Sequence, residues 1–398
     1  MWVYPYLREC TPMNAPVLHS PVRSAMSSAR DPETASRELA TALDHPELGF
    51  VLFFCSAEYD LNALAHSLND AFGEVQLAGC TTAGELTPRG YDQGTITAIG
   101  FDRHLFAVEV GLIEELEKFS LTDAQSEVER LIGRCRERQV APIKGHTFAL
   151  TLLDGLSSQE ELVLLTLDSA LGSIPNFGGS AGDDIHLTGT HVFAGGEFRT
   201  RAAVVVMINT PLDFEVFSTH HMHSLEQKLI VTRADAASRT VYELNAEPAA
   251  LEYARLLGLN PEQLDFKTFA LNPLAVRIGQ EYYVRSIQKV NPDLSLTFYC
   301  AVENGIVLTA MQPGDMLQDL SRRFEQIEST LGEPLITIGC DCFLRRLEAE
   351  YTGQAQKTSE LLTRHQVIGF NTYGEQFDGM HINQTFTGVV IGRTQHGY

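Results

Sequence analysis

The sequence predicts an α/β fold in which repeated strand-helix-strand-turn-strand units form mixed sheets covered by helices, arranged as two domains. A glycine-rich segment, here called the glycine phrase, occurs three times, at residues 79–85, 178–183 and 369–375. An apolar run follows each phrase, at residues 95–101, 202–208 and 385–391. Another apolar run and a helical stretch precede each phrase, with the runs at residues 50–55, 147–153 and 335–340.

The three copies are far apart in the chain, although each unit spans only about 35–40 residues from its first strand to the last glycine. This spacing favours repeated parts of larger sheets over a solenoid. Within the first unit, residues 32–43 predict a helix, since Asp31 can cap it and Pro32 suits its first position. Apolar side chains at helical spacing predict a second helix over residues 59–72 and a third, amphipathic one over residues 123–138.

The pattern changes after residue 209, and we place a domain boundary at about residue 215, which predicts domains at residues 20–214 and 215–398. Residues 229–233 and 240–244 resemble a hairpin, and residues 247–257 predict a helix that ends before Gly258. Further strands are expected at residues 275–278, 282–287, 295–302 and 306–310, followed by a helix at 317–329.

Charge and composition narrow the function classes. Lys and Arg number 29 against 51 Asp and Glu, a net charge of −22, which argues against nucleic acid or an anionic membrane as a partner. No apolar run reaches the roughly 18–20 residues of a membrane helix, and residues 1–14 do not resemble a signal peptide. Seven widely spaced cysteines do not form a disulfide framework, so a cytoplasmic location is expected.

Several motifs together resemble the FIST family of two-part sensory domains. They are the first two glycine phrases with Gly90 and Gly94, Val231-Thr232, residues 241–245 with Pro248-Ala249, Cys342 with Arg345, and the third phrase with Asn383 and Thr385. Residues 52–56, 79–85 and 251–255 are also similar to the heme-containing, nitric-oxide-sensing members of that family. The resemblance covers roughly residues 20–395.

The resemblance implies a signal-binding module, not an enzyme, that regulates a separate histidine kinase or cyclic-di-GMP enzyme. The narrower resemblance implies heme b as cofactor and nitric oxide as ligand. A heme-free module that senses a small metabolite such as an amino acid is the alternative, and a structural adaptor is a third. The residues carry no zinc-protease or nucleophile-elbow motif that would indicate catalysis. A homodimer is one of the oligomeric states left open.

Histidine is the first class of candidate ligand, because a neutral imidazole binds heme iron. His220, His221 and His223 gather within four residues at the suspected domain junction, and in an extended segment His221 and His223 would face one side. The resemblance places the family-like histidine at His221, our first choice for the iron; a polar linker is the alternative. His381 is the second choice, with His104 and His191 behind it.

Arg345 is a candidate partner for a heme propionate, although Asp341 is an equally good partner at helical spacing. Cys340 and Cys342 could bind a soft metal, with Cys55 and Cys80 contributing if the units pack together; inert buried thiols are the alternative.

The glycine phrases are a second candidate site, because exposed backbone N–H groups at strand ends can hold a carboxylate or phosphate. None of the phrases matches a dinucleotide or P-loop pattern, and tight strand connections explain them equally well. The candidate ligand-binding residues are Gly84, Glu85, Gly182, Asp183, Gly374 and Glu375.

Overall fold

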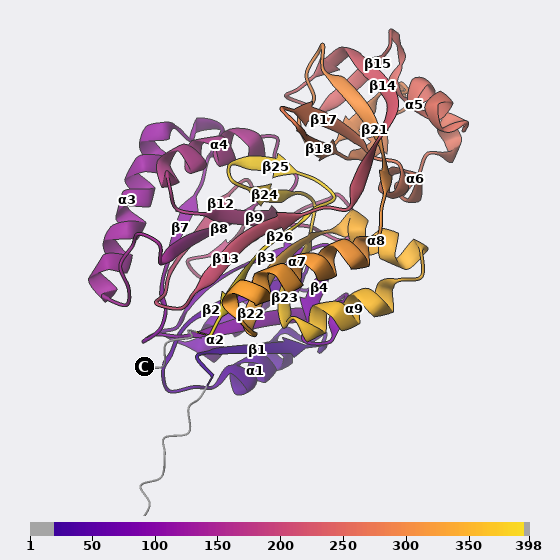
Figure 1. Ribbon diagram of the computed structural model, residues 1–398. Coiled ribbons are helices and arrows are strands. Elements are labelled where there is room, and N and C mark those ends of the chain that lie inside the picture. The colour runs from indigo at the N-terminus through magenta and orange to yellow at the C-terminus, as the bar shows by residue number, and fades with distance from the viewer. Residues whose placement is uncertain (1–19, 394–398) are drawn as a thin grey trace, which may run out of the picture.

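The computed structural model of the chain describes residues 20–393, arranged as a body of three sheets that carries a separate lobe (Figure 1). The expectation about a signal peptide at residues 1–14 therefore lies outside the described residues. The body is built from three units of the same design, and the lobe is inserted into the third.

The first unit begins with the helix that the sequence predicted. The Asp31 carboxylate accepts the Thr34 N–H at 2.9 Å, and the helix buries Ala35, Leu39 and Leu43. The elements of this unit are β1 (Val22–Ser27), α1 (Pro32–Leu43), β2 (Leu48–Ser56), α2 (Leu61–Phe72), β3 (Gln76–Thr82), β4 (Glu85–Thr87), β5 (Gly90–Asp92) and β6 (Ile96–Asp102).

The second unit repeats this order. Its long helix α3 begins two residues before the predicted start, because Ser120 and Asp123 form a capping box. The elements are β7 (Ala107–Ile113), the 3₁₀ turn η1 (Leu116–Lys118), α3 (Leu121–Arg138), β8 (Thr147–Leu153), α4 (Glu160–Leu171), β9 (Asn176–Ser180), β10 (Val192–Ala194), β11 (Glu197–Arg199) and β12 (Ala203–Asn209).

The third unit begins before the lobe and ends after it. Its first strand pairs with its last along six residues, so the chain returns to the same sheet after the lobe. The elements are β13 (Phe214–Thr219), α7 (Met316–Leu331), β22 (Pro334–Cys342), α8 (Phe343–Tyr351), α9 (Ala355–Arg364), β23 (Val367–Thr372), β24 (Glu375–Phe377), β25 (Met380–Ile382) and β26 (Phe386–Gly392).

Each six-stranded sheet is completed by a hairpin from another unit. The strand orders are β1-β6-β2-β3-β10-β11, β7-β12-β8-β9-β24-β25 and β13-β26-β22-β23-β4-β5. The hairpin of the first unit thus joins the third sheet, that of the second joins the first, and that of the third joins the second. The glycine phrases are the points where the chain crosses between sheets. At Gly182 a Cβ atom would lie 2.5 Å from the Ala83 backbone nitrogen, so the crossing requires glycine.

The lobe has its own core and an eight-stranded sheet. The predicted hairpin is confirmed, since β14 and β15 pair antiparallel. The elements are β14 (Met222–Asp235), β15 (Thr240–Leu244), β16 (Glu247–Pro248), α5 (Ala249–Leu257), η2 (Pro261–Gln263), α6 (Phe266–Leu271), β17 (Leu274–Ile278), β18 (Glu281–Arg285), β19 (Ile287–Val290), β20 (Leu296–Phe298) and β21 (Val307–Pro313). The predicted division at residue 215 stays a prediction; in the structure β13 belongs to the body.

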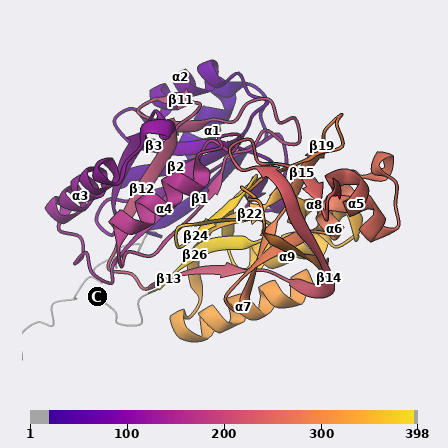
Figure 2. The same ribbon diagram turned by 90° about the horizontal axis from the view of Figure 1, so that it is seen from above.

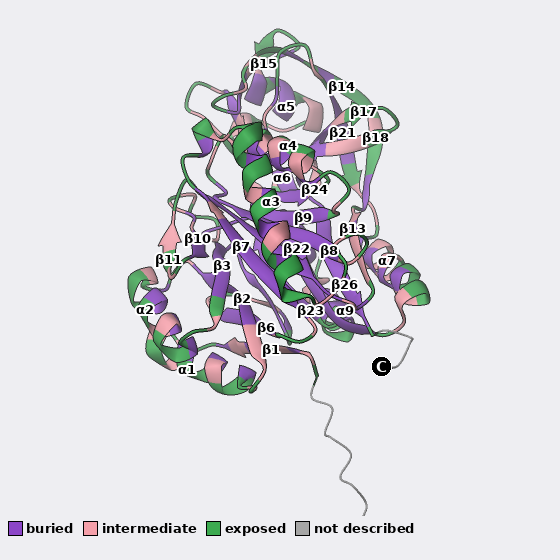
Figure 3. Ribbon diagram, turned by 90° about the vertical axis from the view of Figure 1, so that its left-hand side faces the viewer, coloured by how far each residue is buried: buried purple, intermediate pink, exposed green. Residues whose placement is uncertain are grey.

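The main core lies between the inner faces of the three sheets, where Phe54 of the first sheet stacks on Phe370 of the third at 4.7 Å between ring centroids. Helices cover the outer faces: α1 and α2 the first sheet, α3 and α4 the second, α7 and α9 the third (Figures 2 and 3). The predicted class of helix-covered mixed sheets is confirmed. Across residues 20–393, no helix is long and apolar enough to cross a membrane.

Candidate functional site

Two buried polar clusters lie where the lobe meets the body. The His221 cluster comprises Tyr91, His221, Asp341, Arg345 and Glu348. The His381 cluster comprises Glu160, Glu161, Ser180, Arg239, Cys300 and His381. Each draws residues from segments far apart in the chain, and each contains a histidine that the sequence singled out.

The His221 ring uses both of its nitrogens. Arg345 Nη1 donates to His221 Nδ1 at 2.8 Å, and Nε2 lies 2.8 Å from a Glu348 carboxylate oxygen. Because a guanidinium can only donate, Nδ1 is the acceptor and Nε2 carries the proton that is donated to Glu348. Burial lowers the pKa of His221; Glu348 opposes this effect, and the positive charge of Arg345 adds to it. The ring is therefore held neutral in one tautomer.

Helix α8 positions the partners of this ring. Asp341, Arg345 and Glu348 are spaced by four and three residues, which places them on one face as the chain passes from β22 into α8. Arg345 Nε donates to Asp341 Oδ1 at 2.7 Å, and the Tyr91 hydroxyl donates to the other carboxylate oxygen. Of the two partners considered for Arg345, a heme propionate and Asp341, the structure shows Asp341, and it adds His221. Pairing with a propionate stays a prediction.

The His221 site as folded here does not fit a heme. An iron–Nε2 bond would have to displace Glu348 and move the ring proton to Nδ1, where the Arg345 donor points. The expectation that His221 and His223 share a side is wrong: His221 is 1% exposed and His223 is exposed, because His221 lies outside the strands, between β13 and β14, whereas His223 belongs to β14. Heme binding through His221, His223, His381 or Arg345 stays a prediction.

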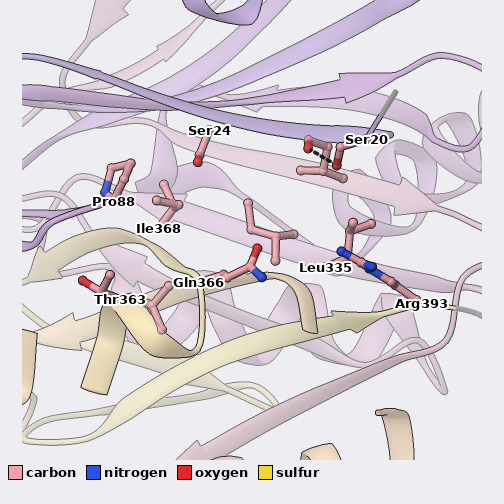
Figure 4. A pocket seen from close by; sticks show the side chains of 11 residues that line it. Ser20, Ser24, Pro88, Leu335, Thr363, Gln366, Ile368 and Arg393 are labelled. Carbon is pink, nitrogen blue, oxygen red and sulfur yellow. Dashed lines mark hydrogen bonds between the residues drawn. The ribbon is translucent and has the colours of Figure 1, made fainter. Parts of the chain in front are cut away.

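A cavity of about 220 Å³ lies elsewhere, between β1 and the strands β22 and β23 (Figure 4). Its lining includes Ser20, Ser24, Pro88, Gln366 and Arg393, and none of the described residues that line it is a histidine. Its volume is below the roughly 300 Å³ at the lower end of ordinary ligand pockets. This cavity therefore gives no support to a heme site.

The His381 cluster joins the lobe to the second and third units. Arg239, in the β14–β15 turn of the lobe, donates to Glu160 and Glu161 at the start of α4, each at 2.7 Å. His381 Nδ1 lies 3.2 Å from Glu161 Oε1, and the Ala301 N–H donates to the same oxygen at 2.8 Å. The cluster thus contains two carboxylates, a guanidinium, an imidazole and the Cys300 thiol.

Charges in the His381 cluster shift one another strongly. Burial disfavours a charged His381 ring, but Cys300 and Glu160 outweigh it and raise the pKa of His381 well above its usual value. Burial also acts to raise the pKa of Glu161, but His381 and Arg239 outweigh it and lower that pKa. The cluster is incomplete nonetheless, because His381 Nε2 and Arg239 Nε have no hydrogen-bond partner within the described part of the chain.

The glycine phrases meet one another in the centre of the body. The Gly182 N–H donates to Thr81 O at 3.0 Å, and the Ala83 N–H donates to Asn371 O at 2.9 Å. Gly374 lies directly under His381, since a Cβ there would be 2.0 Å from His381 Nε2. Tight strand connection accounts for these contacts.

The acidic residues of the phrases are buried and bonded to their own surroundings. Glu85 accepts from the Thr82 and Thr95 hydroxyls, and Glu375 accepts in the same way from Thr372 and Thr385. Asp183 accepts the backbone N–H groups of residues 187–189. Ligand binding by Gly84, Glu85, Gly182, Asp183, Gly374 and Glu375 stays a prediction, with their hydrogen bonds already made within the chain.

The cysteines near the phrases are buried in the shared core. Burial raises the pKa of Cys80, Cys340 and Cys342 well above the ordinary thiol value, which favours the inert alternative.

Of the weaker histidine candidates, His104 is exposed and pairs with Glu47 at 2.8 Å. His191 is partly buried.

The sequence did not point to Glu160, Glu161, Arg239, Cys300 or Glu348. Acidic residues are common in a chain that has 51 of them, so single ones do not stand out. Their partners are also distant in the sequence: Arg239 is 79 residues from Glu160, and Ala301 is 140 residues from Glu161. One local signal was available in the sequence, since Arg239 directly follows the predicted hairpin turn; in the structure its backbone has a left-handed φ of 53°.

Comparison with known families agrees with this architecture. The FIST N domain model matches residues 49–247, and the FIST C domain model matches residues 249–378. The chain belongs to the FIST family, whose domains are sensor domains of signal transduction. The family prediction is confirmed, while the nitric-oxide-sensing subgroup stays a prediction. No curated protein sequence matches the chain.

Proposed function

We propose that this FIST protein senses a small molecule and signals by changing how the lobe, residues 222–313, packs on the body. A separate histidine kinase or cyclic-di-GMP enzyme reads that change. The observation that supports this proposal is the seam itself: Arg239 of the lobe is held by Glu160 and Glu161 of the body. A ligand that binds one arrangement of these charges better than another biases the packing.

The two chain crossings between body and lobe give the seam a hinge. The chain enters the lobe after His221 and leaves it at Gly314, and the Gly314 N–H donates to His221 O at 2.7 Å. The same histidine binds Arg345 and Glu348 of α8 through its ring. A change in the His221 cluster therefore acts directly on both crossings.

The full set of partners on the His221 ring favours a heme-free input, a small metabolite such as an amino acid. The test is a thermal-shift screen of the full chain against single amino acids. A true ligand at about 100 times its Kd stabilises the folded state by roughly 2.7 kcal/mol. An Arg239→Gln variant should lose the response, whereas Arg277→Gln, exposed in the same lobe, should keep it. Equal thermal shifts in both variants would mean that ligand binding does not depend on the contacts of Arg239 with the body, and would contradict the proposal.

Heme with nitric oxide, which the narrower family resemblance implies, is the second candidate, and it requires the His221 ring to exchange its bonds with Glu348 and Arg345 for iron. Hemin titration of the purified chain tests it. A one-to-one Soret band that moves with nitric oxide, weakens in His221→Ala and persists in His223→Ala supports this candidate. Protein that never acquires stoichiometric pigment rules it out. The partner enzyme, the cytoplasmic location and a homodimer stay predictions.

A further inference from the structure

Three residues of metal-binding type converge in the His381 cluster. The ligand atoms of Glu161, Cys300 and His381 all lie within 4.8 Å of one another, and they come from the second unit, the lobe and the third unit respectively. We propose that these three side chains bind one divalent transition metal of the zinc type, with one coordination position left open. The proposal goes beyond the sensor function, and it stands whichever input the sensor has.

The donor set selects this class of metal. A thiolate and an imidazole favour zinc and its neighbours over magnesium or calcium, and three protein ligands are typical of a site with an open position. Zinc–nitrogen and zinc–oxygen bonds of about 2.1 Å put neighbouring ligands of a tetrahedral site roughly 3.4 Å apart. The 3.2 Å between His381 Nδ1 and Glu161 Oε1 is close to that spacing.

The surroundings orient Glu161 and His381 as a metal site requires. The Ala301 N–H and Arg239 hold the Glu161 carboxylate from two sides, at 2.8 and 2.7 Å. His381 is 3% exposed, and its Nε2 has no hydrogen-bond partner among residues 20–393; a carboxylate oxygen of Glu160 lies 3.6 Å away. A metal on Nδ1 leaves the proton on Nε2, facing Glu160, which is the usual carboxylate–histidine–metal arrangement.

Charge within the cluster also suits a divalent cation. In the metal-bound state, where the His381 ring is neutral, the carboxylates of Glu160 and Glu161 together with Arg239 carry a formal charge of −1, and a Cys300 thiolate makes it −2. A divalent ion neutralises that sum in a site that is largely shielded from water. Because its ligands come from three segments, the metal would fasten the lobe to the body.

Cobalt titration of the full chain tests the site. The reduced protein is stripped with a chelator, titrated with Co²⁺ and then challenged with Zn²⁺. We expect a thiolate-to-cobalt charge-transfer band that saturates at one equivalent and disappears when Zn²⁺ is added. Wild-type protein that shows no such band overturns the proposal, and this result does not depend on any variant.

Matched variants identify the ligand. Cys300→Ser should abolish the band and weaken Zn²⁺ binding by at least about 100-fold, since even outer-shell changes cost 10–100-fold. Cys135→Ser removes another buried thiol, in α3, and should leave the band unchanged. Glu58, Asp184 and His186 form a second group of possible metal ligands, but it contains no sulfur. His186→Ala should therefore leave the thiolate-to-cobalt band unchanged. A band that survives in folded Cys300→Ser protein contradicts the assignment. Ligand screens on chelated protein test the sensor function separately.

Discussion

Two buried carboxyl groups should make the protein less stable as the pH rises. Glu85 and Glu375 occupy the same position in the first and third glycine phrases, and both are fully buried. Burial raises the pKa of each to about 7, although hydrogen bonds from neighbouring threonines oppose the shift. Both groups therefore keep their protons in the folded state at pH values where the unfolded chain has lost them.

The sign and size follow from linkage. With an unfolded pKa of 4.5 and a folded pKa of about 7, each group's stabilising contribution is complete below pH 4.5 and is lost as the pH rises through 7. Each pKa unit corresponds to about 1.4 kcal/mol, so each group is expected to account for roughly 3 kcal/mol of pH-dependent stability.

Glu375→Gln isolates this effect, because the amide cannot ionise yet can still accept from Thr385 and donate to Thr372. Urea unfolding between pH 5 and 8 measures the free energy of unfolding of both proteins. The variant should gain roughly 3 kcal/mol relative to wild type across that range. Glu33→Gln, at a side chain 82% exposed, is the matched control and should follow wild type. Parallel curves for wild type and Glu375→Gln would refute the reasoning.

The remaining predictions concern single contacts, the first two measured by urea unfolding and the last by hydrogen exchange. His221→Ala leaves a buried guanidinium and carboxylate without their shared partner and should cost about 3 kcal/mol or more, whereas exposed His223→Ala should stay within about 0.5 kcal/mol. Gly182→Ala forces a Cβ to 2.5 Å from backbone and should cost about 2 kcal/mol, whereas Gly133→Ala, in open space within α3, should stabilise by about 0.5–1 kcal/mol. Arg239→Met strands two carboxylates at the seam, so amide hydrogen exchange in the lobe should accelerate; unchanged exchange would mean that Arg239 does not hold the lobe.

Sequence patterns were sufficient for elements whose signals are local. The helix Pro32–Leu43 and the strand Thr147–Leu153 agree with prediction to the residue, because a capping aspartate and an uninterrupted apolar run define them. The hairpins after the glycine phrases were missed. Their strands are three residues long, and each pairs with a sheet of another unit, so the information that stabilises them lies elsewhere in the chain.

The candidate site was only partly accessible for the same reason. His221 and Arg345 were both selected, but their direct contact spans 124 residues and depends on the path of the chain between β13 and β14. Glu348 was not selected, because its role follows only from the position of α8 beside His221. Candidate ligands can therefore be predicted from residue type, whereas the residues that contact them can be identified only once the topology is known.

The repeated design explains how the two clusters came to occupy the seam. Tyr91 and His381 are the central residues of β5 and β25, the equivalent strands of two exchanged hairpins. Tyr91 reaches the His221 cluster and His381 is the centre of the other, so each of these two hairpins places one polar side chain against a neighbouring unit beside the lobe. The equivalent residue of the second unit is Phe198, which packs against Phe53 and Phe193 in an apolar group. The central residue of the second hairpin strand is thus apolar where the junction is part of an apolar core and polar at the other two junctions. Both polar residues lie where the inserted lobe meets the body.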